Sequence, residues 1–497
     1  MSENSSTTEA EIHPTIAKLS DFSDRLSPMI VKELRQGLRT RTFTGTFLVL
    51  QVVLGFTMLG AMMSQSGDTG RLISSMVFFL FAIVAVILQP LRGITAVATE
   101  LKDDTLEIMS LTRLSSIRIV YGKWASIVSQ TALMLAATIP YLVLRYFFGG
   151  MQLFSELALL LTLFFLSVCL TAVTVGLSCS RSVILRALVP LALIPVGLMA
   201  ISGLAFGREF GLLQEVFSFQ DRETNIGFLV FIAMAAYVGY YFLDMGVGRI
   251  AAVAENHAFR KRLVSLILMG CILVILFLNP PAQTVSALVM VVFLCTIGID
   301  ICTETAVSVP SVVRPFVKRG RAATLIGRSF FYPGWHSGFF LLLVLFVATI
   351  VMGEMTFQKH RAASVGLPDE LLLFIMGVFY TVVAPLLVVR IFINKIKDPF
   401  PGYVMVLVLS AVLTMLVTLF TEISRSGGDG LKILMSWIPG VWILFIERRD
   451  TEEGIIFTGI FLVVVCGALM AMAFQEYRRT AALEAMARAS LAEDEES

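Results

Sequence analysis

Long runs of apolar residues, separated by short polar stretches, dominate the pattern along the chain. A helix needs about 20 apolar residues to cross the hydrocarbon core of a bilayer. The runs lack the alternation of barrel strands, so they predict helices. Twelve runs reach or approach this length: 43–63, 72–91, 124–148, 154–178, 183–206, 226–245, 263–278, 284–304, 338–353, 371–389, 402–420 and 454–474. The pattern predicts an all-α, polytopic helical membrane protein with about 12 transmembrane helices.

One further apolar segment, residues 431–446, is shorter than these runs. Pro439-Gly440 interrupts it, and its length falls below the roughly 17–25 residues of a spanning helix. We therefore expect a re-entrant segment rather than an additional span.

Composition supports a membrane protein and excludes several other classes. Hydrophobic residues make up 57% of the 497 residues and charged residues only 15%, whereas soluble domains carry about 25% charged residues. A disordered chain would be poor in hydrophobic residues. The 38 Lys and Arg residues balance 36 Asp and Glu residues, without a basic stripe for nucleic acid. None of the six cysteines forms a Cys-x-x-Cys pair, so neither a zinc site nor a disulfide framework is indicated.

Positive charges indicate which side of the membrane each loop faces, because cytoplasmic loops are enriched in lysine and arginine. With twelve spans and a cytoplasmic N-terminus, 28 of the 38 Lys and Arg residues lie inside and 10 outside. Both termini are then cytoplasmic. The first 26 residues are polar and do not have the pattern of a signal peptide. We expect a multi-pass protein of the plasma (inner) membrane of a bacterium.

The predicted spans fall into two six-helix halves with the same layout. In each half a long cytoplasmic loop follows the second span. A pair of equivalent halves around a central pathway is a common transporter plan. The tripeptide Arg260-Lys261-Arg262 lies at the joint between the halves. The predicted organisation is a polar tail (1–26), a first half (27–262), a second half (263–474) and a cytoplasmic tail (475–497).

Residues 27–41 predict an amphipathic helix at the cytoplasmic membrane surface, just before the first span. Its apolar residues recur every fourth position and share one face. An ordinary basic flank of the first span would explain the charge of this segment but not its spacing. The cations lie on another face and are Lys32, Arg35 and Arg39.

Residues 100–123 form a charged, helix-forming stretch between the second and third spans. Asp104 followed by Glu107 resembles a capping arrangement that starts a short helix. Leu106, Met109 and Leu111 then supply an apolar patch that has no membrane to enter, and Ser115 could cap a second helix that runs through Lys123 into the third span. A short helix of this kind is suited to docking into a partner's groove. A solvated connector between two spans is the alternative.

Together these two stretches resemble a known family. A basic surface helix followed by E-x-x-D-D-T-L-E-x-x-x-L-T-x-L-S…G-K after the second span is similar to the permease (transmembrane) subunit of a type 2 ABC exporter. The resemblance covers residues 27–262. It implies that residues 27–41 are the connecting helix. It also implies that residues 100–123 carry a coupling helix that seats on a separate ATPase subunit.

The resemblance assigns the partner-binding residues position by position. Asp104 stands where the family usually has Gly and Arg113 where it usually has Pro, although both suit a helix boundary or a solvent-facing turn. Asp103 lies beside them in the same loop. The second half lacks the motif, so any ATPase contact there would be chemically different. The matching positions are Glu100, Thr105, Leu106, Glu107, Leu111, Thr112, Leu114, Ser115, Gly122 and Lys123.

The sequence contains no phosphate-binding loop of the form G-x-x-x-x-G-K-[ST]. Gly122-Lys123 is followed by Trp124 and lacks the upstream glycine. We therefore expect no catalytic residues, cofactor or metal in this chain, which is then not an enzyme. ATP and Mg²⁺ would belong to a separate ATP-binding cassette subunit. The lipid bilayer is the other expected partner, and the oligomeric state stays open.

Few ionisable residues lie within the apolar runs, and such residues are functional candidates by default. Asp244 lies near the inner end of the sixth span, and Asp300 and Glu304 near that of the eighth. Arg145 and Glu156 flank the outer ends of the third and fourth spans. They could line a transport pathway or simply reach water at the interface.

The predicted function is the permease of an ATP-driven exporter, with a substrate that the sequence does not name. One rival is an ion-coupled secondary carrier with twelve helices, although its usual Gly-Asp-Arg type signature after the second span is absent. The other is a membrane scaffold that binds partners through the same loops and transports nothing.

Overall fold

The computed structural model describes most of the chain, and every regular element in the described residues is a helix. These residues are 28–63, 69–102, 115–147, 153–206, 217, 222–251, 255–278, 284–301, 304, 309–360, 368–392, 399–423 and 428–496. The helices up to residue 250 are α2 Pro28–Leu38, α3 Arg41–Met63, α4 Thr69–Ala82, η1 Ile83–Leu88, α5 Gln89–Gly93, α6 Ala98–Lys102, α8 Ser116–Tyr146, α9 Leu153–Ser178, α10 Val183–Phe206 and α12 Arg222–Ile250. The later ones are α13 His257–Leu278, α14 Thr284–Ile301, η3 Pro310–Val312, α15 Arg314–Lys318, α16 Arg321–Ile326, η4 Gly327–Phe331, α17 Trp335–His360, α18 Asp369–Phe392, α19 Phe400–Ile423, α20 Gly428–Leu434, α21 Trp442–Glu447 and α22 Thr451–Glu496.

Among the described residues, eleven helices are long and apolar enough to cross a membrane, where the sequence predicted twelve. The difference is α14, whose apolar part is the shorter Leu288–Ile301. The second span is longer than predicted, because α4, η1, α5 and α6 together run from Leu72 to Lys102. Pro90 does not end this run, since it lies at the start of α5, where a missing N–H is tolerated. The chain is therefore a polytopic helical membrane protein.

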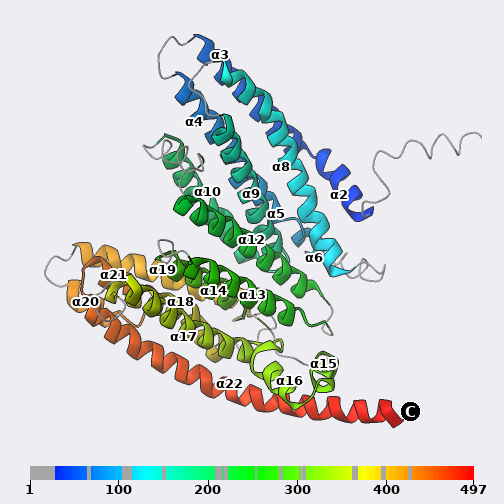
Figure 1. Ribbon diagram of the computed structural model, residues 1–497, viewed down its shortest axis with the longest axis vertical. Helices are drawn as coiled ribbons and strands as arrows, with labels where there is room; N and C mark the ends of the chain where they lie inside the picture. Colours follow the sequence, from blue (N-terminus) through cyan, green and yellow to red (C-terminus); the bar gives the residue numbers. More distant parts are fainter. Residues whose placement is uncertain are drawn as a thin grey trace, which may run out of the picture.

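Figure 1 shows the long helices running roughly side by side, with α2–α12 in its upper part and α13–α22 in its lower part. Helix α12 contacts both α13 and α14 and so connects the two groups. The short helices α2, α6, α15 and α16 lie at the right-hand end, together with the C-terminus. Helices α20 and α21 lie at the opposite end. The elements next to the predicted coupling loop thus share one end of the bundle with the C-terminus.

Helices α9 and α12 pack closely through glycines. A Cβ on Gly176 would overlap the carbonyl oxygen of Phe242, and one on Gly246 would lie 2.8 Å from the Cα of Gly176. Small residues allow helix backbones to approach each other in lipid, where apolar side chains gain little from association. This packing fixes the position of α12, which carries Tyr241 and Asp244.

The C-terminal tail is not a separate short helix. It continues the last span as α22, which has 46 residues and a length of about 69 Å at 1.5 Å per residue. The hydrocarbon core is only about 30 Å thick. The C-terminal part of α22 therefore extends beyond the membrane, where it contacts η3, α15 and η4.

The chain is interrupted within residues 431–446, as the sequence predicted. Two short helices, α20 and α21, are separated by turns around Pro439-Gly440. Gly440 has a φ of +113°, a conformation that glycine adopts without a steric penalty. The depth of this segment in the membrane stays a prediction.

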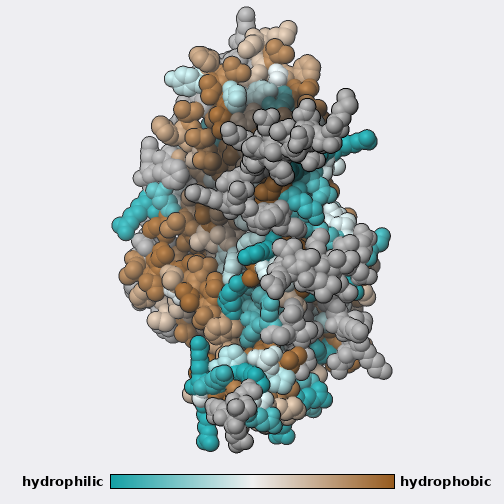
Figure 2. All heavy atoms as spheres, turned by 90° about the vertical axis from the view of Figure 1, so that its right-hand side faces the viewer, coloured by the Kyte–Doolittle hydropathy of each residue, from teal (hydrophilic) through white to brown (hydrophobic). Residues whose placement is uncertain are grey.

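The outer surface of the bundle is strongly apolar. Helix α10, for example, exposes Leu191, Val196 and Met199. Figure 2 shows hydrophobic residues over one side of the view and hydrophilic residues along its centre and across its lower end. The lower end corresponds to the level of the C-terminus in Figure 1. An apolar surface of this extent is suited to contact with lipid.

Candidate functional site

Two clusters of charged side chains lie at the end of the bundle that holds α2 and α6. The first, the Lys123 network, consists of Glu33, Glu100 and Lys123. The second, the Lys261 network, consists of Tyr241, Lys261, Arg262, Asp300 and Glu304. Together they contain four of the candidate site residues selected from the sequence, Glu100, Lys123, Asp300 and Glu304, and each joins several helices.

The Lys123 network joins three helices. The Lys123 ammonium, on α8, lies 2.7 Å from the Glu100 carboxylate on α6 and 3.5 Å from the Glu33 carboxylate on α2. Lys123 is buried, so its charge depends on these two partners. Glu100 and Lys123 begin and end the predicted coupling loop, and the structure brings them together. The sequence reasoning missed Glu33.

Close packing holds α2 against α8. The Ser126 hydroxyl donates a hydrogen bond of 3.0 Å to the backbone carbonyl of Glu33. One turn further along α2, a Cβ on Gly37 would overlap the side-chain amide of Gln130. Gln130 also accepts a hydrogen bond from Arg92 on α5. These contacts fix α2 relative to the second and third spans.

The outward face of α2 is basic, as its sequence predicted. Lys32, Arg35 and Arg39 are all exposed, whereas Leu34 and Leu38 are half-buried. Leu38 packs against the apolar cluster that includes Phe43 and Leu50. The contact of α2 with the membrane surface stays a prediction.

The middle of the predicted coupling loop lies outside the described residues. Ser115 lies at the N-cap position of α8, with extended backbone, and its carbonyl accepts a hydrogen bond of 2.9 Å from the Arg118 amide. Its side chain makes no capping hydrogen bond. The structure thus supports the predicted helix start at Ser115. The predicted residues outside the described part are Asp103, Asp104, Thr105, Leu106, Glu107, Leu111, Thr112, Arg113 and Leu114.

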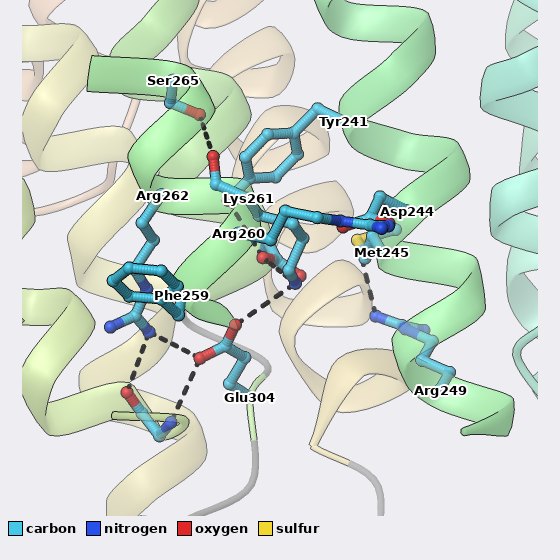
Figure 3. Close-up of polar contacts among 12 residues, drawn as sticks. Tyr241, Asp244, Met245, Arg249, Phe259, Arg260, Lys261, Arg262, Ser265 and Glu304 are labelled. Atoms are coloured by element: carbon cyan, nitrogen blue, oxygen red, sulfur yellow. Dashed lines mark hydrogen bonds and ion pairs between the residues drawn. The ribbon is translucent and has the colours of Figure 1, made fainter. Parts of the chain in front are cut away.

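The Lys261 network pairs the proposed pathway carboxylates with basic residues. Lys261 Nζ lies 2.6 Å from Asp300 Oδ2 and 3.3 Å from Glu304 Oε1. Arg262 Nη2 lies 2.5 Å from Glu304 Oε2. Figure 3 shows the Lys261 and Arg262 side chains converging on Glu304. Asp300, Lys261 and Arg262 are all buried.

Arg262 also binds the backbone that leads into α17. Its guanidinium donates to the carbonyl oxygens of Phe330, Tyr332 and Gly334, at distances of 2.7, 3.2 and 3.3 Å. The Gly334 amide in turn donates a hydrogen bond of 3.1 Å to the Glu304 carboxylate. The network therefore fixes the start of α17 relative to α13.

Helix α12 takes part in the same cluster. The Tyr241 hydroxyl donates a hydrogen bond of 3.0 Å to Asp300 Oδ2, and Asp244 forms an ion pair with Arg260. All three predicted pathway carboxylates are thus paired with the tripeptide Arg260-Lys261-Arg262. The sequence reasoning identified both sets of residues but not their pairing. The feature of the sequence that could have indicated this pairing is the run of three consecutive cations at the start of an apolar span.

A third buried ion pair joins helices α4, α8 and α9. Arg145 Nη2 lies 3.3 Å from Glu156 Oε1, and the Ser74 hydroxyl donates a hydrogen bond of 2.8 Å to the same carboxylate oxygen. The sequence placed Arg145 and Glu156 at the outer ends of their spans. Their burial and mutual pairing point to helix packing.

These clusters are suited to holding helices rather than to chemistry. In the Lys261 network two cations neutralise two carboxylates, and backbone carbonyls and the Ser337 hydroxyl accept further hydrogen bonds from Arg262, as buried charges require. No group of three or more metal-ligating side chains occurs in the part of the chain that the structure describes. Comparisons with family models, with curated proteins and with solved structures gave no match to this chain.

Proposed function

We propose that this chain is the membrane-spanning permease component of an ATP-driven ABC exporter. A separate ATPase subunit hydrolyses ATP, and this chain provides the pathway for a substrate. The observation that carries the proposal is the Lys123 network. It ties Glu100 and Lys123, at the two ends of the predicted coupling loop, to Glu33 on the predicted connecting helix α2.

In this proposal, the end of the bundle that holds α2, α6, α15 and α16 faces the cytoplasm. The excess of Lys and Arg in the loops predicted to lie inside supports this orientation. The N-terminal helix α2 and the C-terminus lie together at this end (Figure 1). The spans form two six-helix halves, with α14 as the shortened eighth member, around a central pathway.

The proposed mechanism transmits movement through helices that are in direct contact. ATP binding draws the partner subunits together and displaces the loop between α6 and α8. Because Lys123 binds carboxylates on both α6 and α2, that displacement also moves α2. The second and third spans, which continue from α6 and α8, then tilt and change the side from which the pathway is open.

The test is association with the ATPase subunit in native membranes. Leu106→Asp places a charge in the apolar docking patch, and Glu107→Lys reverses a charge beside it. Both variants should insert normally into the membrane but lose the ATPase on affinity purification. Leu106→Met keeps the size and apolar character and should retain it. Normal association of both Leu106→Asp and Glu107→Lys would refute the coupling assignment.

An ion-coupled carrier is the second candidate, favoured by the buried pair of Lys261 and Asp300. Ionisable residues inside a membrane commonly take part in ion or proton movement. A carrier would work without an ATPase and would depend on Asp300. Transport that is driven by an ion gradient, resists vanadate and is lost in Asp300→Asn would favour this candidate over the exporter.

A further inference from the structure

Helices α15 and α16 form a small module outside the spans, mounted on the extension of α22. Arg328 forms a bidentate ion pair with Glu484, and Arg314 Nε donates a hydrogen bond of 3.3 Å to the Ser490 hydroxyl. Burial raises the pKa of the Tyr332 phenol, which therefore stays neutral. These contacts fix which face of the module is exposed.

The inner face of the module is aromatic. The Phe316 ring contacts Tyr332 and Phe259, with ring centroids 5.2 and 5.6 Å apart. Gly327 fits between the rings of Phe316 and Tyr332, since a Cβ there would lie 2.8 and 2.6 Å from them. The inner face of the module therefore packs against the rest of the protein, and only the outer face is available for binding.

The outer face combines cations with exposed apolar side chains. Lys318, Arg319 and Arg321 are exposed, and Leu325 and Ile326 are 59% and 52% exposed. Arg321 and Leu325 lie four residues apart and therefore share one side of α16. We call these five residues the α16 surface.

The chain segment that contains α15 and α16 carries only positive charges. Between Glu304 and Glu354 the chain contains no acidic residue, whereas the stretch before α17 holds five cations. Cations with adjacent exposed apolar residues are typical of segments that lie in the interface of an anionic bilayer.

The module also lies next to the membrane. The candidate span in α17 begins at Trp335, only nine residues after Ile326, so the chain cannot carry the module far from the bilayer. The Arg328 guanidinium lies 5.0 Å from the centre of the Tyr477 ring, three residues after the end of the predicted last span. Leu325 and Ile326 precede Arg328 by a turn or less, which places them close to the headgroup region.

We propose that the α16 surface binds anionic lipid headgroups of the adjacent leaflet, with Leu325 and Ile326 inserted among the lipids. A protein partner fits this surface less well, because two apolar residues fall far short of the roughly 800 Å² per partner of a stable interface. The inference requires only the bilayer and does not depend on the proposed function.

The experiment compares lipid responses of the full-length protein in neutral detergent. Phosphatidylglycerol or phosphatidylcholine is titrated in, and the melting temperature reports binding. Each cation near an anionic surface contributes roughly fivefold to the binding constant. The triple variant Lys318→Gln/Arg319→Gln/Arg321→Gln should therefore need on the order of 100-fold more phosphatidylglycerol for the same shift. Its response to phosphatidylcholine should be unchanged.

The control compares two single variants. Arg321→Gln should need roughly fivefold more phosphatidylglycerol for the same shift. Arg488→Gln removes an exposed cation of α22 that lies eleven residues beyond Tyr477, and it should respond as the wild type does. Leu325→Ser/Ile326→Ser should weaken the response to phosphatidylglycerol without removing a charge. Equal responses of the triple variant and the wild type, or of Arg321→Gln and Arg488→Gln, would overturn the proposal, as would equal stabilisation of the wild type by inorganic phosphate. Loss of a co-purifying protein from the α16 triple variant, with lipid response intact, would indicate protein docking instead.

Discussion

The Lys123 and Lys261 networks have the same plan in two different environments. Each holds a buried lysine between two carboxylates from other segments of the chain. In the Lys261 network, the side chains of Lys261 and Asp300 are only 5% and 3% exposed, and that of Glu304 is 12% exposed, so the Lys261–Asp300 pair is the most buried part. In the Lys123 network, the side chains of Glu33 and Glu100 are 14% and 16% exposed.

This difference predicts different roles. A buried charge that loses its partner has no access to water, so the Lys261 network can open only at a high cost in free energy. Carboxylates in partial contact with water exchange partners more readily. The Lys261 network is therefore suited to a fixed joint among α12, α13, α14 and α17. The Lys123 network, beside the predicted coupling loop, is suited to a joint that moves.

The largest expected effect comes from breaking the fixed joint. Lys261→Met leaves Asp300 buried without its cation, and losing one member of a buried pair costs about 3–5 kcal/mol. We expect a markedly lower melting temperature in detergent and little monodisperse protein. Lys102→Met, at an exposed lysine of α6, is the control. The double variant Lys261→Met/Asp300→Asn should recover part of the loss, and a Lys261→Met protein as stable as the control would contradict this account.

An intermediate effect is expected at the other lysine. Lys123→Met leaves Glu33 and Glu100 without their shared cation, but both side chains are partly exposed. We expect a cost of about 1–2 kcal/mol, between exposed and buried pairs, with normal yield from membranes. Lys123→Arg keeps the charge and should melt close to the wild type. A destabilisation as large as that of Lys261→Met would remove the distinction between the two networks.

The smallest effect is expected at the longest contact. Glu33→Gln removes only the 3.5 Å interaction with Lys123, so we expect a loss of about 0.5 kcal/mol or less. Glu100→Gln removes the 2.7 Å interaction and should cost more. Thermal melting of the two single variants at low salt provides the comparison. Reversal of their order would show that α2, rather than α6, holds Lys123 in place.

The sequence predicted the spans well because an apolar run of sufficient length is a local property. The sequence also placed Lys32, Arg35 and Arg39 on one face because helical spacing is a local property too, and all three side chains are exposed. The pairing of Asp244, Asp300 and Glu304 with residues 260–262 depends on helix packing, which no local pattern contains. The same holds for Glu33, which has no distinguishing neighbours in the sequence. The unbroken α22 was missed because charged residues after Phe474 end the apolar run without ending the helix.

The central claim is that this chain works with a separate ATPase, and ATP hydrolysis by the purified complex tests it most directly. The protein would be isolated from native membranes in mild detergent, all bound chains identified, and vanadate-sensitive hydrolysis measured. The account predicts a soluble chain with a phosphate-binding loop and ATPase activity that disappears with Leu106→Asp. A lone protein without hydrolysis, under conditions that preserve known complexes, would contradict it.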